Sequence, residues 1–147
     1  MSDDLLNDDH HIYLESIQPL VYLSGPMDCV SEEEGRRWRE EAKELLAAHE
    51  LKAIDPYDLE QEVTIPNLLV KTDLCWILRS SGMIINASQN VVVWGSPMET
   101  LWAHMHRVIN IAFVEECKPS PWLSAHSKVV QTLDQAVECV AWEIHRL

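Results

Sequence analysis

The chain has 147 residues, with 11 Lys plus Arg against 24 Asp plus Glu, and its formal net charge is −13. This length suits one domain with its own core, and the negative charge disfavours nucleic acid polymers and membrane surfaces as partners. No stretch approaches the roughly 18 apolar residues of a membrane span, and the N-terminus is acidic where a secretory signal would be basic. We therefore expect a cytoplasmic protein that binds small molecules.

The N-terminal segment and the cysteines carry no chemistry that their pattern identifies. Residues 1–15 predict an acidic tail, and residues 16–147 a single domain. The cysteines lack the CxxC spacing of a zinc or disulfide framework, so we expect reduced packing residues and neither a metal nor a cofactor. They are Cys29, Cys75, Cys117 and Cys139.

The first third of the chain predicts a strand, a helix and a second strand. The run LVYLSGP (20–26) predicts a buried strand that ends in a tight loop. Ser31 and Glu34 then have the spacing of a capping box at the start of an amphipathic helix. The apolar stripe of this helix consists of Trp38, Ala42, Leu45 and Leu46. Residues 51–55 predict a short strand that Pro56 breaks.

The rest of the chain repeats the alternation. Residues 55–65 predict a loop, and Pro66 suits the first turn of a helix that continues to about Ser80. Its expected apolar stripe is Val70, Leu74, Ile77 and Leu78. The later predictions are a strand at 83–86, a loop at 87–94, a helix opened by Ser96 and Pro97, a strand at 108–114, a loop at 115–127, a strand at 128–131 and a helix at 133–147.

Strands that alternate with helices predict an α/β fold, a mostly parallel sheet of about five strands with right-handed crossovers. In such sheets ligands bind outside the carboxyl ends of the strands. The loops expected at that edge hold Ser24, Gly25 and Pro26, then Asp55, Pro56, Tyr57 and Asp58, then Asn86, and finally Gly95 and Ser96.

Two carboxylates stand out against this scaffold. Asp73 lies three residues after Val70 and four before Ile77, which places it on or beside the expected stripe. It is either a solvated group paired with Lys71 or Arg79, or a partly desolvated acid whose raised pKa lets it deliver a proton.

Glu99 also has two interpretations. With Ser96 as N-cap and Pro97 at the first helical position, it completes a second capping box. The same helix N-terminus would keep the carboxylate ionised, as a nucleophile for an electrophilic sugar carbon requires. In this arrangement Glu99→Gln would cost at most about 1 kcal/mol of stability through a weakened cap.

Other polar and aromatic candidates have weaker support. His104 and His106 are two residues apart and point to different helix faces, so an ordinary pair is favoured over a metal site. The cluster of Arg36, Arg37 and Arg39 fits a solvated helix face better than an anion site. Trp94 and Trp122, which are flanked by loop residues, could contact a planar base.

Several segments in this order resemble the nucleoside 2-deoxyribosyltransferase superfamily, which includes the related deoxynucleoside monophosphate N-glycoside hydrolases. They are VYLSGPM, DPYD, DLCWIL followed by MIIN, WGSPMET and PWLSAHSKVVQTLDQAVECV, and they cover about residues 20–142. The resemblance implies a flavodoxin-like or Rossmann-like three-layer sandwich and dimers or higher homo-oligomers. It also implies cleavage of the bond between a nucleobase and its sugar.

The resemblance assigns roles to individual residues. Glu99 matches the family's nucleophile in a Gly-[Thr/Ser]-x-x-Glu pattern, and Asp73 matches the aspartate that handles the proton of the departing base. The implied substrate-binding residues are Tyr22, Ser24, Gly25, Pro26, Asp55, Tyr57, Asn86, Gly95 and Ser96. The segment with Ser120, Trp122 and Ser124 matches a region that reaches a neighbouring subunit's site in some members.

Two positions depart from the family pattern. Val93 stands where some relatives bind the sugar's 5′ end with Asp or Ser, and Ser81 stands where many have an aspartate. Substrate choice is therefore open between three alternatives: transfer of the sugar of a nucleoside to another base, hydrolysis of nucleoside 5′-monophosphates, and nucleotide binding without turnover.

Overall fold

The computed structural model describes residues 17–59, 65–88 and 93–147. Along these ranges, strands alternate with helices over most of the chain, as the sequence predicts. The elements are β1 (Leu20–Ser24), α1 (Glu32–Ala48), β2 (Lys52–Ile54), α2 (Pro56–Leu59), α3 (Pro66–Arg79), β3 (Gly82–Asn86), α4 (Gly95–Met105), β4 (Ile109–Phe113), α5 (Pro121–His126), β5 (Lys128–Val130) and α6 (Leu133–His145).

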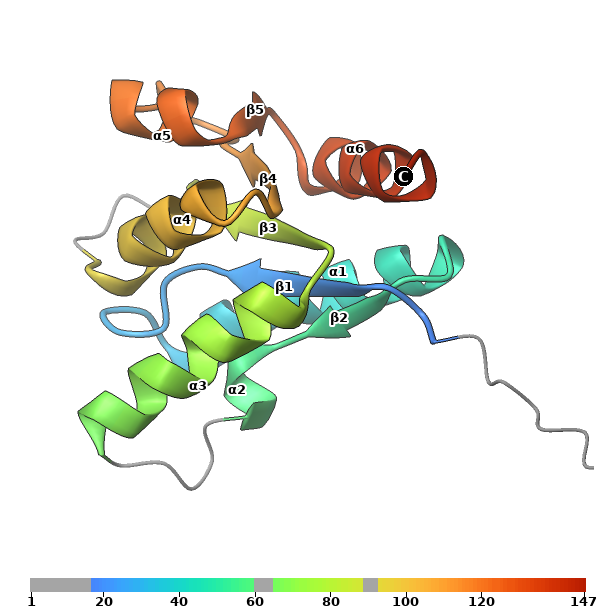
Figure 1. Cartoon of the computed structure of the whole chain (residues 1–147). Helices are drawn as coiled ribbons and strands as arrows, with labels where there is room; N and C mark the ends of the chain where they lie inside the picture. Colours follow the sequence, from blue (N-terminus) through green and yellow to red (C-terminus); the bar gives the residue numbers. More distant parts are fainter. Residues whose placement is uncertain (1–16, 60–64, 89–92) are drawn as a thin grey trace, which may run out of the picture.

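The strands form one sheet in the order β2-β1-β3-β4-β5, and all neighbours are parallel (Figure 1). Tyr22 in β1 lies opposite Ile54 in β2 and Met83 in β3. The chain crosses from one side of β1 to the other between β2 and β3, so the strand order reverses beside β1. The carboxyl ends of β1 and β3 flank this reversal, which is where open α/β sheets bind ligands.

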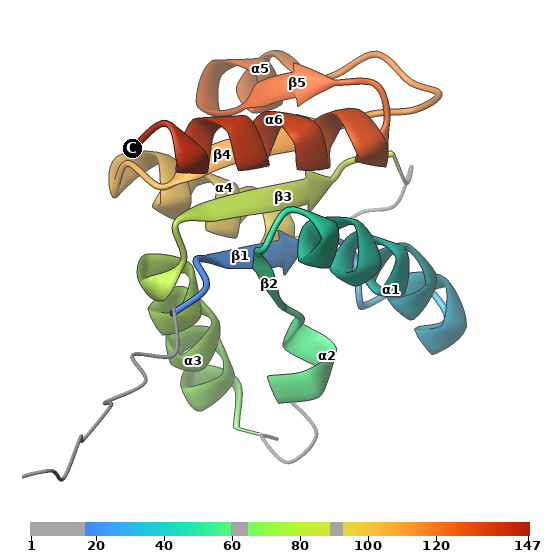
Figure 2. The ribbon, with the colours of Figure 1, turned by 90° about the vertical axis from the view of Figure 1, so that its right-hand side faces the viewer.

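Helices cover both faces of the sheet and complete a three-layer sandwich. Figure 2 shows α1 and α6 together on one face, with α3, α4 and α5 on the other. Alternate strand residues serve the two layers: Val21 and Leu23 pack with α1 and α6, whereas Tyr22 packs with α3 and α4. The α/β fold class with a parallel sheet is therefore confirmed.

Local signals set the helix starts. The Ser31–Glu34 capping box is present at α1, and Pro66 occupies the first turn of α3. The segments predicted as loops at 55–65 and 115–127 each contain a short helix, which is a correction. At α2 the Asp55 carboxylate accepts a hydrogen bond from the Tyr57 amide at 3.0 Å, and at α5 the Ser120 hydroxyl accepts one from the Leu123 amide at 3.1 Å.

Two packing predictions are also wrong. On α3, Ile77 is fully buried, but Val70 is 53% exposed and Leu78 47% exposed. Figure 1 shows the N-terminal end of α3 extending away from the strands, so a full apolar stripe has no sheet to cover. The four cysteines are free, and Cys139 packs against the core as predicted, but Cys29, Cys75 and Cys117 are exposed, so the packing role predicted for these three is wrong. The loop predicted at 87–94 lies partly outside the described residues.

None of the helices in the described ranges combines the length and apolar character that a membrane crossing requires.

A substitution at Gly82 tests how closely α6 packs against the sheet. A Cβ atom at this position would lie 2.6 Å from Cγ2 of Val140 on α6. We expect Gly82→Ala to lower the free energy of unfolding by about 1–3 kcal/mol through overpacking. Gly95→Ala is the control, because its Cβ would meet no atom within 4 Å. Equal denaturant midpoints for the two variants would contradict this packing.

Candidate active site

The Glu99 carboxylate is held by two hydroxyl groups of the same strand. The Tyr22 hydroxyl donates a hydrogen bond to Oε1 at 3.0 Å, and the Ser24 hydroxyl donates one to Oε2 at 2.5 Å. Because alternate residues of β1 share a face, both side chains point toward the layer that contains α4. Both are fully buried, so they fix the position of the carboxylate at the carboxyl end of β1.

The predicted capping role of Glu99 is wrong. The helix begins at Gly95, with Trp94 as N-cap and no side-chain cap, so Glu99 is not the third helical residue of a Ser96 box. Its carboxylate turns to β1 instead. The Ser96 carbonyl accepts a hydrogen bond from the Thr100 hydroxyl at 2.7 Å, as part of the ordinary helical spacing.

The expectation that the helix terminus keeps Glu99 ionised also needs correction. Burial raises the pKa of this carboxyl, and the negative charge of Asp73 raises it further. The hydrogen bonds from Ser24 and Tyr22 and the positive charge of Arg39 act in the opposite direction, but the net pKa is raised. Glu99 lies in the second turn of α4, where the field of a helix terminus has already fallen off.

Asp73 is brought to the same place from α3. It is half-buried, and its charge is close enough to Glu99 to raise the pKa of that carboxyl. The helices α3 and α4 contact each other on the same face of the sheet. Two carboxylates from distant parts of the sequence thus form one electrostatically coupled pair.

The turn after β1 packs tightly around Gly25. A Cβ at Gly25 would lie 2.8 Å from Cζ2 of Trp38 and 3.3 Å from Cβ of Asn86, so a larger residue would displace both. Pro26 is buried next to it. Asn86, at the end of β3, accepts a hydrogen bond from the Ser88 amide at 3.0 Å. This close packing brings the carboxyl ends of β1 and β3 together.

Asp55 and Tyr57 face α1 in this structure. The Asp55 carboxylate is buried and lies 3.5 Å from Nε of Arg39 and 3.0 Å from Nζ of Lys43. The Tyr57 ring lies under the guanidinium groups of Arg36 and Arg39. Their expected role in binding a base stays a prediction.

A cavity of about 660 Å³ lies on the other side of α4, between that helix and α5. Among the predicted site residues it is lined by Pro26, Asn86, Ser96, Ser120 and Trp122. Glu99 and Asp73 are not among its lining residues. The two carboxylates therefore lie on one side of α4, and the predicted segment 120–124 lies on the other.

The segment at α5 is exposed. Trp122 is 78% exposed and stacks on the ring of His126, with ring centroids 6.0 Å apart. Ser120 caps α5, and Ser124 is exposed on it. Trp94 is likewise exposed at the rim of the cavity. A contact of this segment with a neighbouring subunit stays a prediction.

Metal ligands do not gather in the described part of the chain, where no group of three His, Cys, Asp or Glu side chains could hold an ion. His104 and His106 are both exposed. The ring of His104 lies 4.9 Å from that of His126, and the ring of His106 lies 4.0 Å from that of Trp102.

Comparisons with known proteins find similarity in structure but not in sequence. No protein-family model matches the chain, and none of the curated proteins matches its sequence at a significant level. A 2-desoxiribosyltransferase from Leishmania mexicana superposes with a TM-score of 0.72 at 14% identity, covering 88% of this chain and 99% of that one. The chain has the fold of the 2-deoxyribosyltransferases.

Two further solved structures share this deoxyribosyltransferase fold. A 2-deoxyribosyltransferase from the psychrotolerant bacterium Bacillus psychrosaccharolyticus has a TM-score of 0.68 at 14% identity and covers 79% of this chain and 88% of its own. A conserved protein from Enterococcus faecalis V583 has a TM-score of 0.70 at 11% identity, and the match covers 86% of this chain and 99% of that one. The resemblance inferred from sequence motifs is thus confirmed at the level of the fold.

The two departures from the family pattern lie at different ends of the deoxyribosyltransferase fold. Val93 is half-buried and lines the cavity beside α4. Ser81 precedes β3, and its amide donates a hydrogen bond to the Leu20 carbonyl at the start of β1. Ser81 therefore lies at the amino ends of the strands, opposite the edge where such sheets bind ligands, so its position does not support a role in substrate choice.

Arg39 is the site residue that sequence reasoning missed. The sequence pattern predicts Arg39 on a solvated helix face with Arg36 and Arg37, but its side chain is fully buried. Its spacing to Ala42 and Leu46 is three and seven residues, which places it on the buried stripe of α1. This helical spacing could have predicted that Arg39 is buried, but its position next to Arg36 and Arg37 favoured an exposed face instead.

Glu99→Gln tests the cost of burying this charge. A carboxyl whose pKa is raised by folding stabilises the folded state only while it is protonated, and this contribution is lost as the pH rises through the folded pKa. We therefore expect E99Q to unfold at a higher temperature than the wild type at pH 7.5. The difference should shrink toward pH 4, where both side chains are neutral.

Glu44→Gln is the control, because Glu44 is exposed on α1. A lower unfolding temperature for E99Q than for wild type at pH 7.5 would contradict the raised pKa of Glu99.

Proposed function

We propose that this protein cleaves the N-glycosidic bond of nucleosides and transfers the sugar to another base. One observation carries the proposal. The Glu99 carboxylate, oriented by the Tyr22 and Ser24 hydroxyls, is coupled to Asp73 at the ligand-binding edge of a deoxyribosyltransferase fold. A nucleophile and a proton donor are the two groups that displacement of a base from a sugar requires.

The reaction divides between the two carboxylates. In the reactive form the two carboxyl groups share one proton, which Asp73 carries while Glu99 is ionised. A carboxylate oxygen of Glu99 attacks the anomeric carbon, and the carbon–nitrogen bond breaks as the protonated Asp73 gives its proton to the departing base. A glycosyl ester of Glu99 results. An incoming base then attacks the same carbon, returns a proton to Asp73 and releases Glu99, so the configuration at the anomeric carbon is retained.

The polar surroundings support a nucleoside over a monophosphate. Arg36 and Arg37 form ion pairs with Glu32 and Glu33 one turn earlier on α1, at 2.7 Å and 3.3 Å. Arg39 is buried and engaged within the protein. The arginine cluster, which had left a phosphate site open, is therefore paired within the protein, although Ser96 and Lys118 line the neighbouring cavity.

A substrate panel separates the three alternatives. The protein is incubated with deoxynucleosides, ribonucleosides and their 5′-monophosphates, with and without an acceptor base, and free base is followed by chromatography. We expect base exchange that requires an acceptor and an unphosphorylated nucleoside. Base release from monophosphates alone would indicate the hydrolase, and binding without turnover would contradict an enzyme.

Substitution of each carboxylate tests its role in the exchange. We expect Glu99→Gln to lower kcat by about 10³-fold or more, because the nucleophile is lost. Asp73→Asn should lower it by about 10²- to 10⁴-fold for bases that need protonation. Glu44→Gln, on the exposed face of α1, should leave kcat unchanged. Full activity of E99Q would overturn the assignment of the nucleophile.

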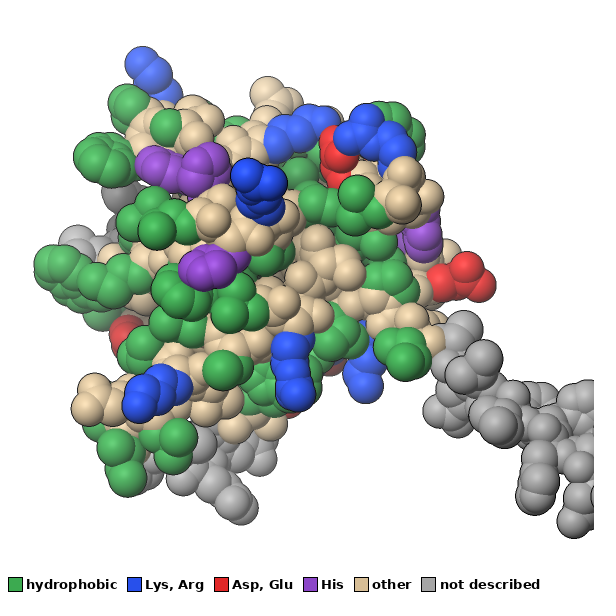
Figure 3. All heavy atoms as spheres, viewed as in Figure 1, with side chains coloured by type: hydrophobic (Ala, Val, Ile, Leu, Met, Phe, Trp, Pro, Cys, Tyr) green, Lys and Arg blue, Asp and Glu red, His purple; other side chains and the backbone are tan. Residues whose placement is uncertain are grey.

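We also propose that the chain forms homo-oligomers, as the sequence resemblance implies. Figure 3 shows hydrophobic side chains along the edge of the molecule where α4 and α5 lie. Large exposed hydrophobic residues follow one side of α4 at spacings of three and four residues, next to Trp122 of α5. They are Trp94, Met98, Leu101 and Met105. A contiguous exposed apolar surface of this kind favours association.

Light scattering after size-exclusion chromatography tests this surface. We expect wild type to elute as a dimer or larger species and Leu101→Asp to reduce its mass, because a charge would be buried in the contact. Trp142→Asp is the control, since Trp142 is exposed on α6 across the sheet. A monomeric wild type at micromolar concentration would contradict the proposal.

A further inference from the structure

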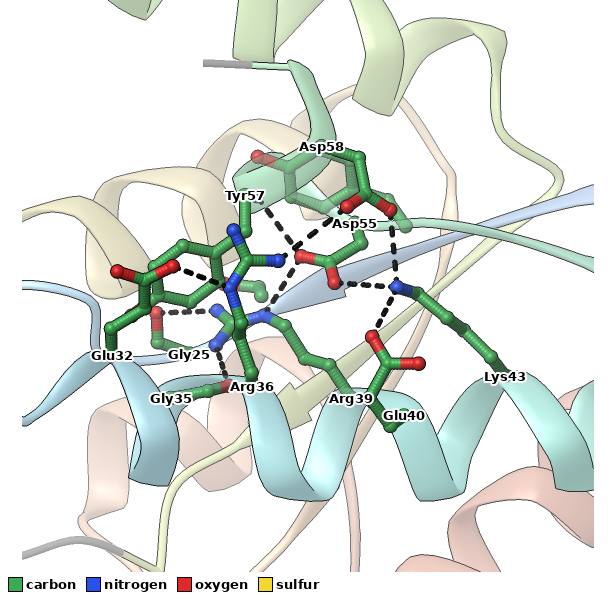
Figure 4. A network of polar contacts seen from close by, with 12 residues as sticks. Gly25, Glu32, Gly35, Arg36, Arg39, Glu40, Lys43, Asp55, Tyr57 and Asp58 are labelled. Carbon is green, nitrogen blue, oxygen red and sulfur yellow. Dashed lines mark hydrogen bonds and ion pairs between the residues drawn. The ribbon is translucent and has the colours of Figure 1, made fainter. Parts of the chain in front are cut away.

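Arg39 is a buried cation that joins three separate parts of the fold (Figure 4). Its Nη1 donates to the Gly35 carbonyl at 2.6 Å, and its Nη2 donates to the Gly25 carbonyl at 3.0 Å. Its Nε lies 3.5 Å from the Asp55 carboxylate. One guanidinium thus connects α1, the turn after β1 and the end of β2.

The contact with Gly25 leads directly to the proposed nucleophile. Gly25 follows Ser24, whose hydroxyl donates the 2.5 Å hydrogen bond to Glu99. A displacement of the Gly25 carbonyl would therefore move the residue that orients the carboxylate. The rings of Trp38 and Tyr57 lie against the guanidinium, at 4.6 Å and 5.1 Å from its central carbon, and limit its movement.

The charge of Arg39 is not fully neutralised by its nearest anion. Asp55 is shared with Lys43, whose Nζ approaches it to 3.0 Å, closer than Arg39 does. Lys43 also lies 2.7 Å from Glu40 and 3.1 Å from Asp58. A buried cation with an incompletely compensated charge acts over several ångströms, because the interior screens it weakly.

We propose that Arg39 is a positioning residue for Glu99: it holds the Ser24–Gly25 turn in place and supplies a buried positive charge to the nucleophile. This inference rests on the proposed function of Glu99. The groups around that carboxylate are Tyr22 and Ser24 from β1, Asp73 from α3 and Arg39 from α1. Arg39 is the cation among them, and it lowers the pKa of Glu99 against the effects of burial and Asp73.

The titration of Glu99 tests the electrostatic part without any need for activity. The carboxyl carbon is followed by ¹³C NMR against pH in each folded variant, and its signal is assigned by its loss in E99Q. We expect Arg39→Gln to move the Glu99 midpoint to higher pH than in wild type. Asp55→Asn, which keeps Arg39 and removes its counter-charge, should move the midpoint to lower pH.

Opposite shifts separate a charge effect from general damage, which would move both variants in one direction. Arg39→Lys keeps the positive charge but has fewer hydrogen-bond donors, so the Glu99 midpoint in this variant should fall between those of wild type and R39Q. If R39Q does not fold, R39K takes its place in the comparison. A Glu99 midpoint in R39Q equal to that of wild type would overturn the proposal. If R39K is used instead, an unchanged midpoint in R39K together with an upward shift in D55N would overturn it.

The pH profile of base exchange tests the positioning part. We expect R39Q to lower kcat by about 10- to 100-fold, as misplacement of a reacting group does. The loss in kcat should be larger at pH 6 than at pH 8, because a higher Glu99 midpoint leaves less of the carboxyl ionised at the lower pH. Arg37→Gln is the matched control, because Arg37 is exposed and pairs with Glu33. If wild type shows no exchange on any substrate, the proposed function fails, while the NMR titration still decides the role of Arg39.

Discussion

The burial of one carboxylate is the constraint on which this site depends. Glu99 is removed from most of the solvent at the carboxyl end of β1, and a charge in that position needs hydrogen bonds and a nearby cation. The hydrogen bonds come from the two-residue period of a strand, which points the Tyr22 and Ser24 hydroxyls to the same face. The raised pKa that remains shows that burial outweighs these partners, as a reactive group at an active site allows.

A second layer of charge supports the first. Arg39, Asp55 and Lys43 form a chain of ion pairs between α1 and the end of β2, and Arg39 continues it to the turn after β1. Removal of one member of such a buried chain leaves its partner uncompensated, which costs more than the pair itself contributes. The segments that carry the proposed site are therefore linked to one another through charge as well as through the apolar core.

Local patterns predicted the site only in part. The alternation of strands and helices identified the parallel sheet, and Ser31 with Glu34 identified the start of α1, because both signals are contained within a few neighbouring residues. The same reasoning placed Glu99 in a capping box that does not exist, since Ser-x-x-Glu spacing also occurs one turn into a helix. Arg39 was missed for a related reason: the sequence shows its charged neighbours on the helix but not the two carbonyl groups and the carboxylate that contact its guanidinium.

The sequence by itself determined the order of the five strands and of the longer helices α1, α3, α4 and α6, the alternating faces of β1 and the candidates Asp73 and Glu99. Each of these follows from short-range periodicity or from motifs in a fixed order. Tertiary structure alone decided that these two carboxylates lie close enough to interact electrostatically, that the Ser24 hydroxyl contacts Glu99, and that Arg39 is buried behind the β1 turn. These are contacts between segments far apart in the chain. They arise only when the strand order places β1 between β2 and β3, with α1 on one face of the sheet and α3 and α4 on the other.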